Sequence, residues 1–271
     1  MKSLTVKLIV TLLLTISLTA NAKTDTDLWR ASDHSSVSII NHDLWGELLS
    51  SHVHLAESGV NLFAYTDVTA ADRNKLSAYI ESMAMVRIDE FNAQEQLAYW
   101  INLYNALTVS VILENYPVTS IRKIGGSFFA PGPWNQTVVS VKGQDLTLND
   151  IEHRIIRPVF ADKRIHYAVN CASIGCPNLS PAVYQGATLG EQLDAAACEF
   201  IRHPRGVQIS GDKLRLSSIY KWYIEDFGDS VEALKPHLAE CLDPEVAERL
   251  LQLETGFGKV KYQYDWKLNA K

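Results

Sequence analysis

Apolar residues recur along the first half of the chain at the three- and four-residue spacing that is typical of helices. Residues 44–59 and 70–85 both show this spacing. A third, longer segment begins at Asn92, which can cap a helix with Glu95 as its capping-box partner. Because this segment is apolar almost all round as far as Leu113, we expect it to form the central buried helix.

Two asparagines lie within this apolar helix. Asn102 and Asn105 are one turn apart and therefore share a face. A buried carboxamide that finds no partner costs roughly 1–3 kcal/mol, so both side chains need hydrogen bonds. We expect them either to hold a neighbouring loop or to face a functional site.

The second half of the chain mixes shorter helical and strand-like segments. Helices are expected over residues 148–157, 188–202 and 217–228, the first of them ended by Pro158. Strands are expected over residues 137–141, 165–171, 207–209 and 213–216. Since helices outnumber strands, we predict an α+β fold, a mostly helical single domain packed around a small β-sheet.

The N-terminus has the pattern of a secretory signal peptide. Lys2 and Lys7 come before an apolar run, LIVTLLLTISLT, and Ala20-Asn21-Ala22 matches a cleavage site. We expect removal of residues 1–22 by cleavage after Ala22, which leaves residues 23–271 as one globular domain in the periplasm or outside the cell. The run is shorter than the ~20 residues that a membrane-spanning helix needs, so no membrane span is expected after cleavage.

The charge balance limits the class of partner. The chain has 25 Lys and Arg residues and 31 Asp and Glu residues, and without Lys2 and Lys7 the difference is 23 − 31, a net charge of −8. This acidic excess argues against nucleic acid as a partner. The sequence has no nucleotide-binding glycine loop and no serine-nucleophile elbow. We therefore expect a small molecule or a peptide as partner, and the sequence requires no cofactor.

Reactive side chains concentrate in the segment RIHYAVNCASIGCP, residues 164–177. Strand alternation would put His166 and Asn170 on one face and Cys171 on the other. Ser173 and Cys176 follow in what we expect to be a tight loop. Two thiols, an imidazole and a carboxamide this close can form a nucleophilic site, a metal site or a disulfide, and the sequence leaves these three alternatives open.

In the first alternative, Cys171 or Cys176 is the nucleophile of a thiol-dependent hydrolase or transferase. A cysteine reacts as its thiolate, which an adjacent imidazole stabilises. Because His166 is expected to point away from Cys171, it would serve Cys176 after the loop folds back, and His153 is a second candidate base. A polar side chain must orient that base, and the candidates are Asn102, Asn105 and Asp226.

The second alternative is a zinc site. Cys171 and Cys176, together with His166 or His153 and with Glu152, supply enough ligands for Zn²⁺. Their C-x4-C spacing lies at the edge of the range that zinc sites use. No second ligand pair follows in the sequence at the distance typical of a zinc finger.

The third alternative is a non-catalytic envelope domain that binds a ligand or acts as a scaffold. Four cysteines allow three disulfide pairings. A structural Cys171–Cys176 disulfide would brace the loop in this case. Aromatic residues, several of them in a glycine-rich segment, would then line a groove: Phe128, Phe129, Trp134 and Trp222.

Four motifs follow one another along the chain: AYWINLYNALTV, LTLNDIEHRIIRP, RIHYAVNCASIGCPNLSP and IYKWYIEDFG. In this order and spacing they resemble the domain-of-unknown-function 547 family, DUF547, over roughly residues 40–230. The matching positions are Asn102, Tyr104, Asn105, Glu152, His153, His166, Cys171, Ser173, Cys176, Pro177, Trp222, Tyr223, Asp226 and Phe227. Similar members are secreted in bacteria and intracellular in plants, and thiols in both settings fit a reduced or metal-binding pair better than a disulfide.

The resemblance implies no established activity. It implies a secreted bacterial protein whose four motifs form a polar cleft, with these expected ligand-binding residues: Asn105, Glu152, Asn170, Ser173, Trp222 and Asp226. A core helix followed by a strand that carries a histidine is also similar to papain- or transglutaminase-like folds. In those folds the helix contributes the cysteine, whereas here the helix offers Asn102 as the candidate catalytic residue.

Overall fold

The computed structural model describes residues 25–125, 132–256 and 258–271, so the predicted signal peptide, Phe128 and Phe129 lie outside the described residues. The helices are α1 (Asp43–His52), α2 (Ala70–Ala84), α3 (Ala93–Glu114), α4 (Arg157–Phe160), α5 (Leu189–Arg202), α6 (Ile219–Trp222), α7 (Val231–Ala239) and α8 (Pro244–Gln252). The strands are β1 (Val53–Leu55), β2 (Asn61–Phe63), β3 (Thr137–Val141), β4 (Gln144–Thr147), β5 (Val207–Ser210), β6 (Lys213–Ser217) and β7 (Val260–Gln263). This mixture confirms the α+β prediction. No helix in these ranges is long and apolar enough to cross a membrane.

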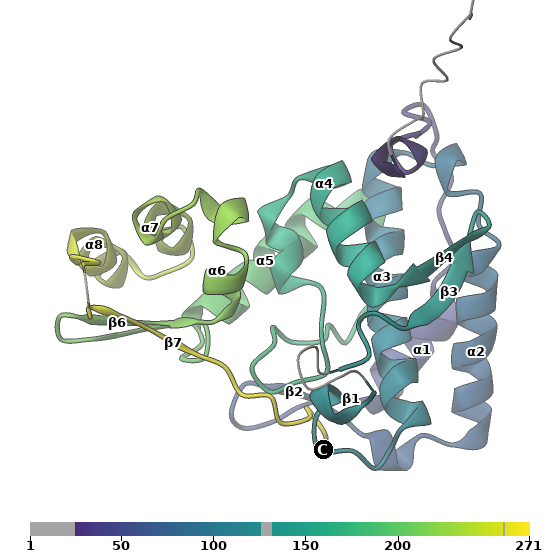
Figure 1. The fold of residues 1–271 in the computed structure, drawn as a ribbon, viewed down its shortest axis with the longest axis horizontal. Coiled ribbons are helices and arrows are strands. Elements are labelled where there is room, and N and C mark those ends of the chain that lie inside the picture. The colour runs from purple at the N-terminus through teal and green to yellow at the C-terminus, as the bar shows by residue number, and fades with distance from the viewer. Residues whose placement is uncertain (1–24, 126–131, 257) are drawn as a thin grey trace, which may run out of the picture.

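The strands form three separate small sheets and not the one sheet that the sequence predicted. β1–β2 and β3–β4 are antiparallel pairs, whereas in β5–β6–β7 the last strand runs parallel to β6. Figure 1 shows α1, α2 and α3 with β3–β4 at one end of the molecule and α6, α7 and α8 with β6–β7 at the other. The buried apolar residues fall into two clusters accordingly, one around α3 and one around α5, α6 and α7.

α3 is buried along nearly its whole length, as predicted. Asn92 caps it by accepting a hydrogen bond from the Glu95 N–H at 3.0 Å. The Glu95 carboxylate does not complete the predicted capping box. It accepts instead from the Ile40 N–H at 2.8 Å and from the Gly186 N–H at 3.0 Å. The first turn of α3 therefore anchors two segments that are distant in the sequence.

The two asparagines of α3 hold neighbouring backbone, which is one of the two roles predicted for them. The Asn102 amide donates to the Tyr184 carbonyl at 2.8 Å and accepts from the Tyr184 N–H at 3.0 Å. The Asn105 amide donates to the Ala168 carbonyl at 2.9 Å and accepts from the Asn170 N–H at 2.8 Å. Each amide thus pairs with a carbonyl and an N–H of the segment that it faces.

The strand predicted over residues 165–171 is wrong. Lys163–Tyr167 form a short 3-10 helix, and the chain then continues as an irregular loop. The Asn105 amide forms hydrogen bonds with the backbone of this loop. In a sheet, a neighbouring strand would supply such bonds. The alternation that placed His166 and Cys171 on opposite faces therefore does not hold.

Three predicted helices have different bounds. α1 ends earlier than predicted, at His52, where the β1–β2 hairpin begins. The helix after β4 is a π-helix, Asp150–Ile156, and it continues into α4 instead of ending at Pro158. Pro158 lies in the first turn of α4, just after the junction with the π-helix. The predicted aromatic helix 217–228 is divided into α6 and a 3-10 helix, Ile224–Phe227.

A C-terminal segment, residues 264–271, returns from β7 to residues 168–177, which we name the thiol loop. The Gly175 N–H donates to the Asp265 carbonyl at 2.8 Å. A Cβ atom at Gly175 would lie 2.7 Å from the Asp265 nitrogen, so glycine allows the two segments to approach this closely. The sequence did not predict this contact, nor did it predict α7 and α8.

We expect an Asn102→Ala substitution to destabilise the fold. The change leaves the buried N–H and carbonyl of Tyr184 without partners, which costs about 2–4 kcal/mol of the free energy of unfolding. Chemical denaturation of wild type and variant measures the difference. Asn115→Ala is the matched control, because that amide makes one hydrogen bond at the exposed end of α3 and its loss should cost about 1 kcal/mol or less. Unchanged stability together with lost ligand binding would show that Asn102 serves a site and not the fold.

Candidate functional site

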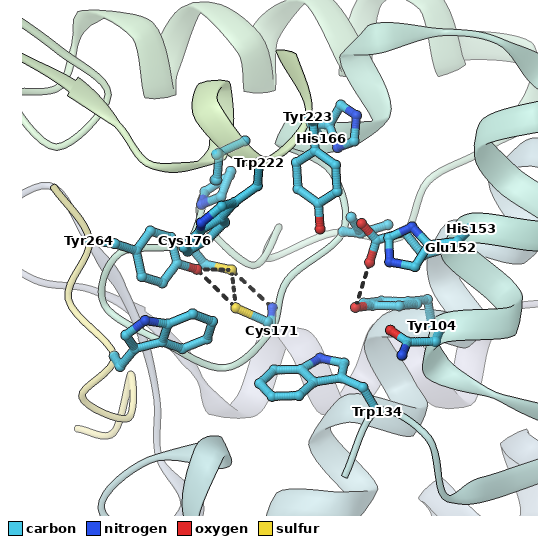
Figure 2. Close-up of a pocket in the computed structure, with 15 residues that line it drawn as sticks. Tyr104, Trp134, Glu152, His153, His166, Cys171, Cys176, Trp222, Tyr223 and Tyr264 are labelled. Carbon is cyan, nitrogen blue, oxygen red and sulfur yellow. Dashed lines mark hydrogen bonds between the residues drawn. The ribbon is translucent and has the colours of Figure 1, made fainter. Parts of the chain in front are cut away.

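A pocket opens where the thiol loop, the π-helix, α6 and the C-terminal segment meet (Figure 2). Six of the predicted site residues line it: Glu152, His153, His166, Cys171, Cys176 and Trp222. The other five do not line it: Asn102, Asn105, Asn170, Ser173 and Asp226. Figure 2 shows the two sulfurs towards one end of the pocket and the Glu152 carboxylate towards the other.

The two sulfurs lie against each other at the thiol end of the pocket. Cys171 Sγ and Cys176 Sγ are 2.7 Å apart, and both cysteines are free. The Cys171 N–H donates to Cys176 Sγ at 3.0 Å. The Tyr264 hydroxyl lies 3.0 Å from Cys171 Sγ and 3.2 Å from Cys176 Sγ, and the Ser173 hydroxyl lies 3.2 Å from Cys171 Sγ. Hydrogen-bond donors therefore surround the pair.

Asn170 fixes the loop that carries both sulfurs. Its amide donates to the Pro177 carbonyl at 2.7 Å and accepts from the Ala172 N–H at 2.7 Å. Ala172 has a φ of 57°, in the left-handed region, and this turn brings Cys171 and Cys176 together. Asn170 thus contributes to the site by positioning the sulfurs.

The surroundings of the pair favour one thiolate. Burial by itself raises the pKa of the Cys176 thiol, but hydrogen bonds from the Cys171 thiol, Tyr264 and the Cys171 backbone lower it to about 7. The hydrogen bond to Cys176 and burial together raise the pKa of Cys171 well above its ordinary value. The pair therefore loses one proton near neutral pH and retains the other between its two sulfurs.

Glu152 places a buried carboxylate at the other end of the pocket. It is 5% exposed and accepts a hydrogen bond from the Tyr104 hydroxyl at 3.0 Å. Burial raises the pKa of Tyr104 and of Tyr223, and the Glu152 charge raises both pKa values further. Both phenols therefore stay protonated beside the carboxylate.

His166 is held by a carboxylate and an aromatic ring. Its Nε2 lies 2.6 Å from Asp226 Oδ2, and its ring stacks on Tyr223 with the centroids 4.2 Å apart. Burial by itself raises the pKa of Asp226, but hydrogen bonds from His166 and Arg157 lower it. His153 Nδ1 lies 3.3 Å from Nη1 of the same arginine. Asp226 thus acts on the pocket by positioning His166.

In the part of the chain that the structure describes, no imidazole contacts a thiol. Among the described residues, the sulfurs have as hydrogen-bond partners the Cys171 N–H, the hydroxyls of Ser173 and Tyr264, and each other. The contact expected between His166 and Cys176 is therefore not formed. A phenol and not an imidazole is the titratable group that touches both sulfurs.

Comparison with known protein families gives a match inside this chain. Residues 88–201 match the model of a family described as protein of unknown function, DUF547. This part of the chain is similar to DUF547. The segment includes the thiol loop, Glu152 and both histidines of the pocket, whereas Trp222, Tyr223 and Tyr264 lie beyond it. No curated protein and no solved structure matches the chain.

The Cys171–Cys176 disulfide considered for the scaffold alternative is wrong. Cys171 and Cys176 are free, and the disulfide of the structure joins Cys198 on α5 to Cys241, which follows α7. The free sulfurs are hydrogen-bonded to the Cys171 N–H and to the hydroxyls of Ser173 and Tyr264. Within the described ranges, no group of three or more His, Cys, Asp and Glu side chains is arranged to hold a metal ion. Zinc binding stays a prediction.

Most of the aromatic side of the pocket is not predicted by the sequence. Trp134 lines the pocket, as expected in the alternative with an aromatic groove. Tyr104 and Tyr223 also line it, and the sequence identifies these two only as positions that match the family motifs. Tyr264 and Trp266 were missed. The run YQYDW at residues 262–266, with aromatic side chains at alternate positions, was a signal, but nothing in it indicated a contact with the thiol loop.

We expect a Tyr264→Phe substitution to raise the lower pKa of the thiol pair by about one unit, because the thiolate loses one of its hydrogen-bond donors. The thiolate fraction at neutral pH should fall accordingly. The ultraviolet absorbance of the thiolate, followed from acid to neutral pH, measures the shift. Tyr262→Phe, which removes a neighbouring hydroxyl that makes no contact with sulfur, is the control. Identical titration curves for the two variants would contradict the role of Tyr264.

Proposed function

We propose that this protein is a dithiol–disulfide exchange enzyme that uses Cys171 and Cys176. The observation that carries the proposal is a pair of free sulfurs 2.7 Å apart, one with a pKa of about 7. Thiolates are the nucleophiles of disulfide exchange, and an attacking thiol is most effective when its pKa is near the ambient pH. A second thiol in contact with the first can then resolve the mixed disulfide.

The electrons of this reaction balance without a further reactant. The Cys176 thiolate attacks one sulfur of a substrate disulfide, forms a mixed disulfide and expels the other half of the substrate as a thiolate. Cys171 then gives its proton to that thiolate and attacks the Cys176 sulfur. A Cys171–Cys176 disulfide forms and the second half of the substrate leaves as a thiolate. The substrate gains two electrons and the cysteine pair loses two; the reverse reaction oxidises a substrate dithiol.

A thiol-dependent hydrolase or transferase, the reaction class predicted from the sequence, would use the same thiolate. It also needs a group that transfers protons beside the nucleophile, and His166 and His153 are the candidate bases predicted for it. His166 is bonded to Asp226 and contacts neither sulfur. Exchange between sulfurs needs no such group, because a thiolate leaves without protonation. The second free thiol also has a role in exchange, since it resolves the mixed disulfide. The geometry therefore supports exchange better than acyl chemistry, and better than a scaffold in which the thiolate would serve no purpose.

The reaction of the reduced protein with an aromatic disulfide, dithiobis-nitrobenzoate, tests the proposal. We expect wild type to release both halves of the reagent and to end as a Cys171–Cys176 disulfide with no reagent attached. Cys171→Ser should release one half and keep the other on Cys176, because the resolving thiol is absent. Absorbance of the released thiolate and intact mass measure the two outcomes.

The paired variant Cys198→Ala/Cys241→Ala is the control, since it removes the other disulfide and should react like wild type. Cys176→Ser should react at least tenfold more slowly at neutral pH, because the remaining thiol lacks the lowered pKa. A wild-type protein that keeps the reagent as a stable adduct would rule out the paired mechanism.

We also propose that the protein acts outside the cytoplasm after cleavage behind Ala22. The N-terminal pattern supports this. So does the Cys198–Cys241 disulfide, since structural disulfides form mainly in oxidising compartments. The intact mass of the protein isolated from its native cells should correspond to residues 23–271. A mass that still includes residues 1–22 would contradict export.

A further inference from the structure

The carboxylate of Glu152 is not neutralised by any cation of the described residues. Among the described residues that line the pocket, none is a lysine or an arginine. Arg157, which lies behind the wall, is paired with Asp226 and Glu225. Glu152 is 5% exposed, and it accepts a hydrogen bond from the Tyr104 hydroxyl, which is neutral. A buried charge without a counter-ion is costly, so this end of the pocket favours a cationic ligand.

The titratable groups that face the carboxylate do not cancel this charge. His166 lines the pocket, but its Nε2 is bonded to Asp226, so a proton on this ring is balanced by that carboxylate. His153 is exposed to solvent, and its Nδ1 lies against Arg157. The phenol of Tyr223 keeps its proton because burial and Glu152 raise its pKa. The remaining charges on the lining are those of Glu152 and the thiolate, and both are negative.

Aromatic rings line the space between these two negative groups. Figure 2 shows Trp134 and Tyr223 on opposite sides of the space between Glu152 and the sulfurs. Trp222, which is 45% exposed, packs against Tyr264 with the ring centroids 4.7 Å apart. The faces of Trp and Tyr rings attract cations, and a cage of such rings is a known means of binding ammonium groups.

Two of these lining rings already accept a cation on one face. The Arg122 guanidinium lies 5.1 Å from the ring centroid of Trp266. The Arg157 guanidinium lies 5.1 Å from the ring centroid of Tyr223. No cation–π contact is recorded in the described part of the chain for Trp134, Trp222 or Tyr264.

We propose that the pocket selects a low-molecular-weight disulfide or thiol that carries an ammonium group. The ammonium group lies against Glu152 and the aromatic rings, and the sulfur of the ligand lies at Cys171 and Cys176. The part of this proposal that concerns the substrate rests on the proposed disulfide exchange. Glu152 and the rings remain when the thiols are removed, so the binding of the ammonium group can be measured without them.

Binding is measured first in the thiol-free variant Cys171→Ser/Cys176→Ser, with tetramethylammonium as the probe and tryptophan fluorescence as the readout. We expect saturable quenching by tetramethylammonium and none by the neutral isostere tert-butanol. Adding Glu152→Gln should weaken the affinity about tenfold. Glu245→Gln, which removes the same charge from the exposed first turn of α8, is the matched control and should leave the affinity unchanged.

Trp222→Ala, a change at a half-exposed position, should also weaken the binding several-fold, and it keeps the test valid if the Glu152 variant fails to fold. Equal binding of tetramethylammonium and tert-butanol would overturn the inference. So would an affinity that neither Glu152→Gln nor Trp222→Ala reduces.

Exchange rates are then compared in the protein with both thiols, using cystamine, hydroxyethyl disulfide and dithiodipropionate as cationic, neutral and anionic substrates. We expect cystamine to react fastest, and Glu152→Gln to reduce its advantage about tenfold while leaving the neutral substrate unchanged. Equal rates for the three substrates would overturn the inference while leaving disulfide exchange intact. Cation binding without any exchange would leave the ammonium site standing and would contradict the proposed function instead.

Discussion

Two hydrogen bonds from the Asn105 side chain hold the thiol loop against the buried helix α3, and the arrangement of the pocket depends on them. The loop backbone beyond Tyr167 is neither helix nor strand, so its N–H and carbonyl groups have no regular partners. Asn105 supplies partners from inside the core for the Ala168 carbonyl and the Asn170 N–H. Asn105 thereby positions Asn170. The Asn170 amide in turn bonds the Ala172 N–H and the Pro177 carbonyl, at the two ends of the turn that carries the sulfurs. The sulfur positions thus follow from amide–backbone bonds that start on α3.

A loop held in this way explains how a buried sulfur can carry a charge. Cys176 is 3% exposed, and burial of a thiolate without hydrogen bonds would be costly. The Cys171 N–H and the Tyr264 hydroxyl already point at this sulfur. Donors that are fixed before the charge forms need no rearrangement when it does, and this is why they outweigh desolvation. The hydroxyl of Tyr264 stays protonated because burial and the neighbouring sulfurs raise its pKa.

The sequence predicts the features of the fold that depend on local patterns of residues. It does not predict the features that depend on contacts between distant segments. The start of α3 follows from its cap and its apolar period, and the cost of burying Asn102 and Asn105 required that both be bonded. Their partners could not be predicted, because these belong to segments more than sixty residues away. The period-two pattern of residues 165–171 wrongly predicted a strand. The Asn105 side chain, and not a neighbouring strand, forms the hydrogen bonds to this backbone. Tyr264 reaches the sulfurs only through the long-range backbone bonds of the C-terminal segment.

The distribution of charge couples ligand binding to the reactivity of the thiols. Tyr104 and Tyr223 experience the negative charge of Glu152 and also that of the two sulfurs, since all of these raise their pKa values. An ammonium group bound among the rings would lie in the electric field of both Glu152 and the sulfurs. It would therefore lower the pKa of the thiol pair, and the thiolate would in turn strengthen the binding of the cation by the same factor. A cationic substrate would thus favour the ionised form of the nucleophile that attacks it, whereas an anionic one would suppress that form.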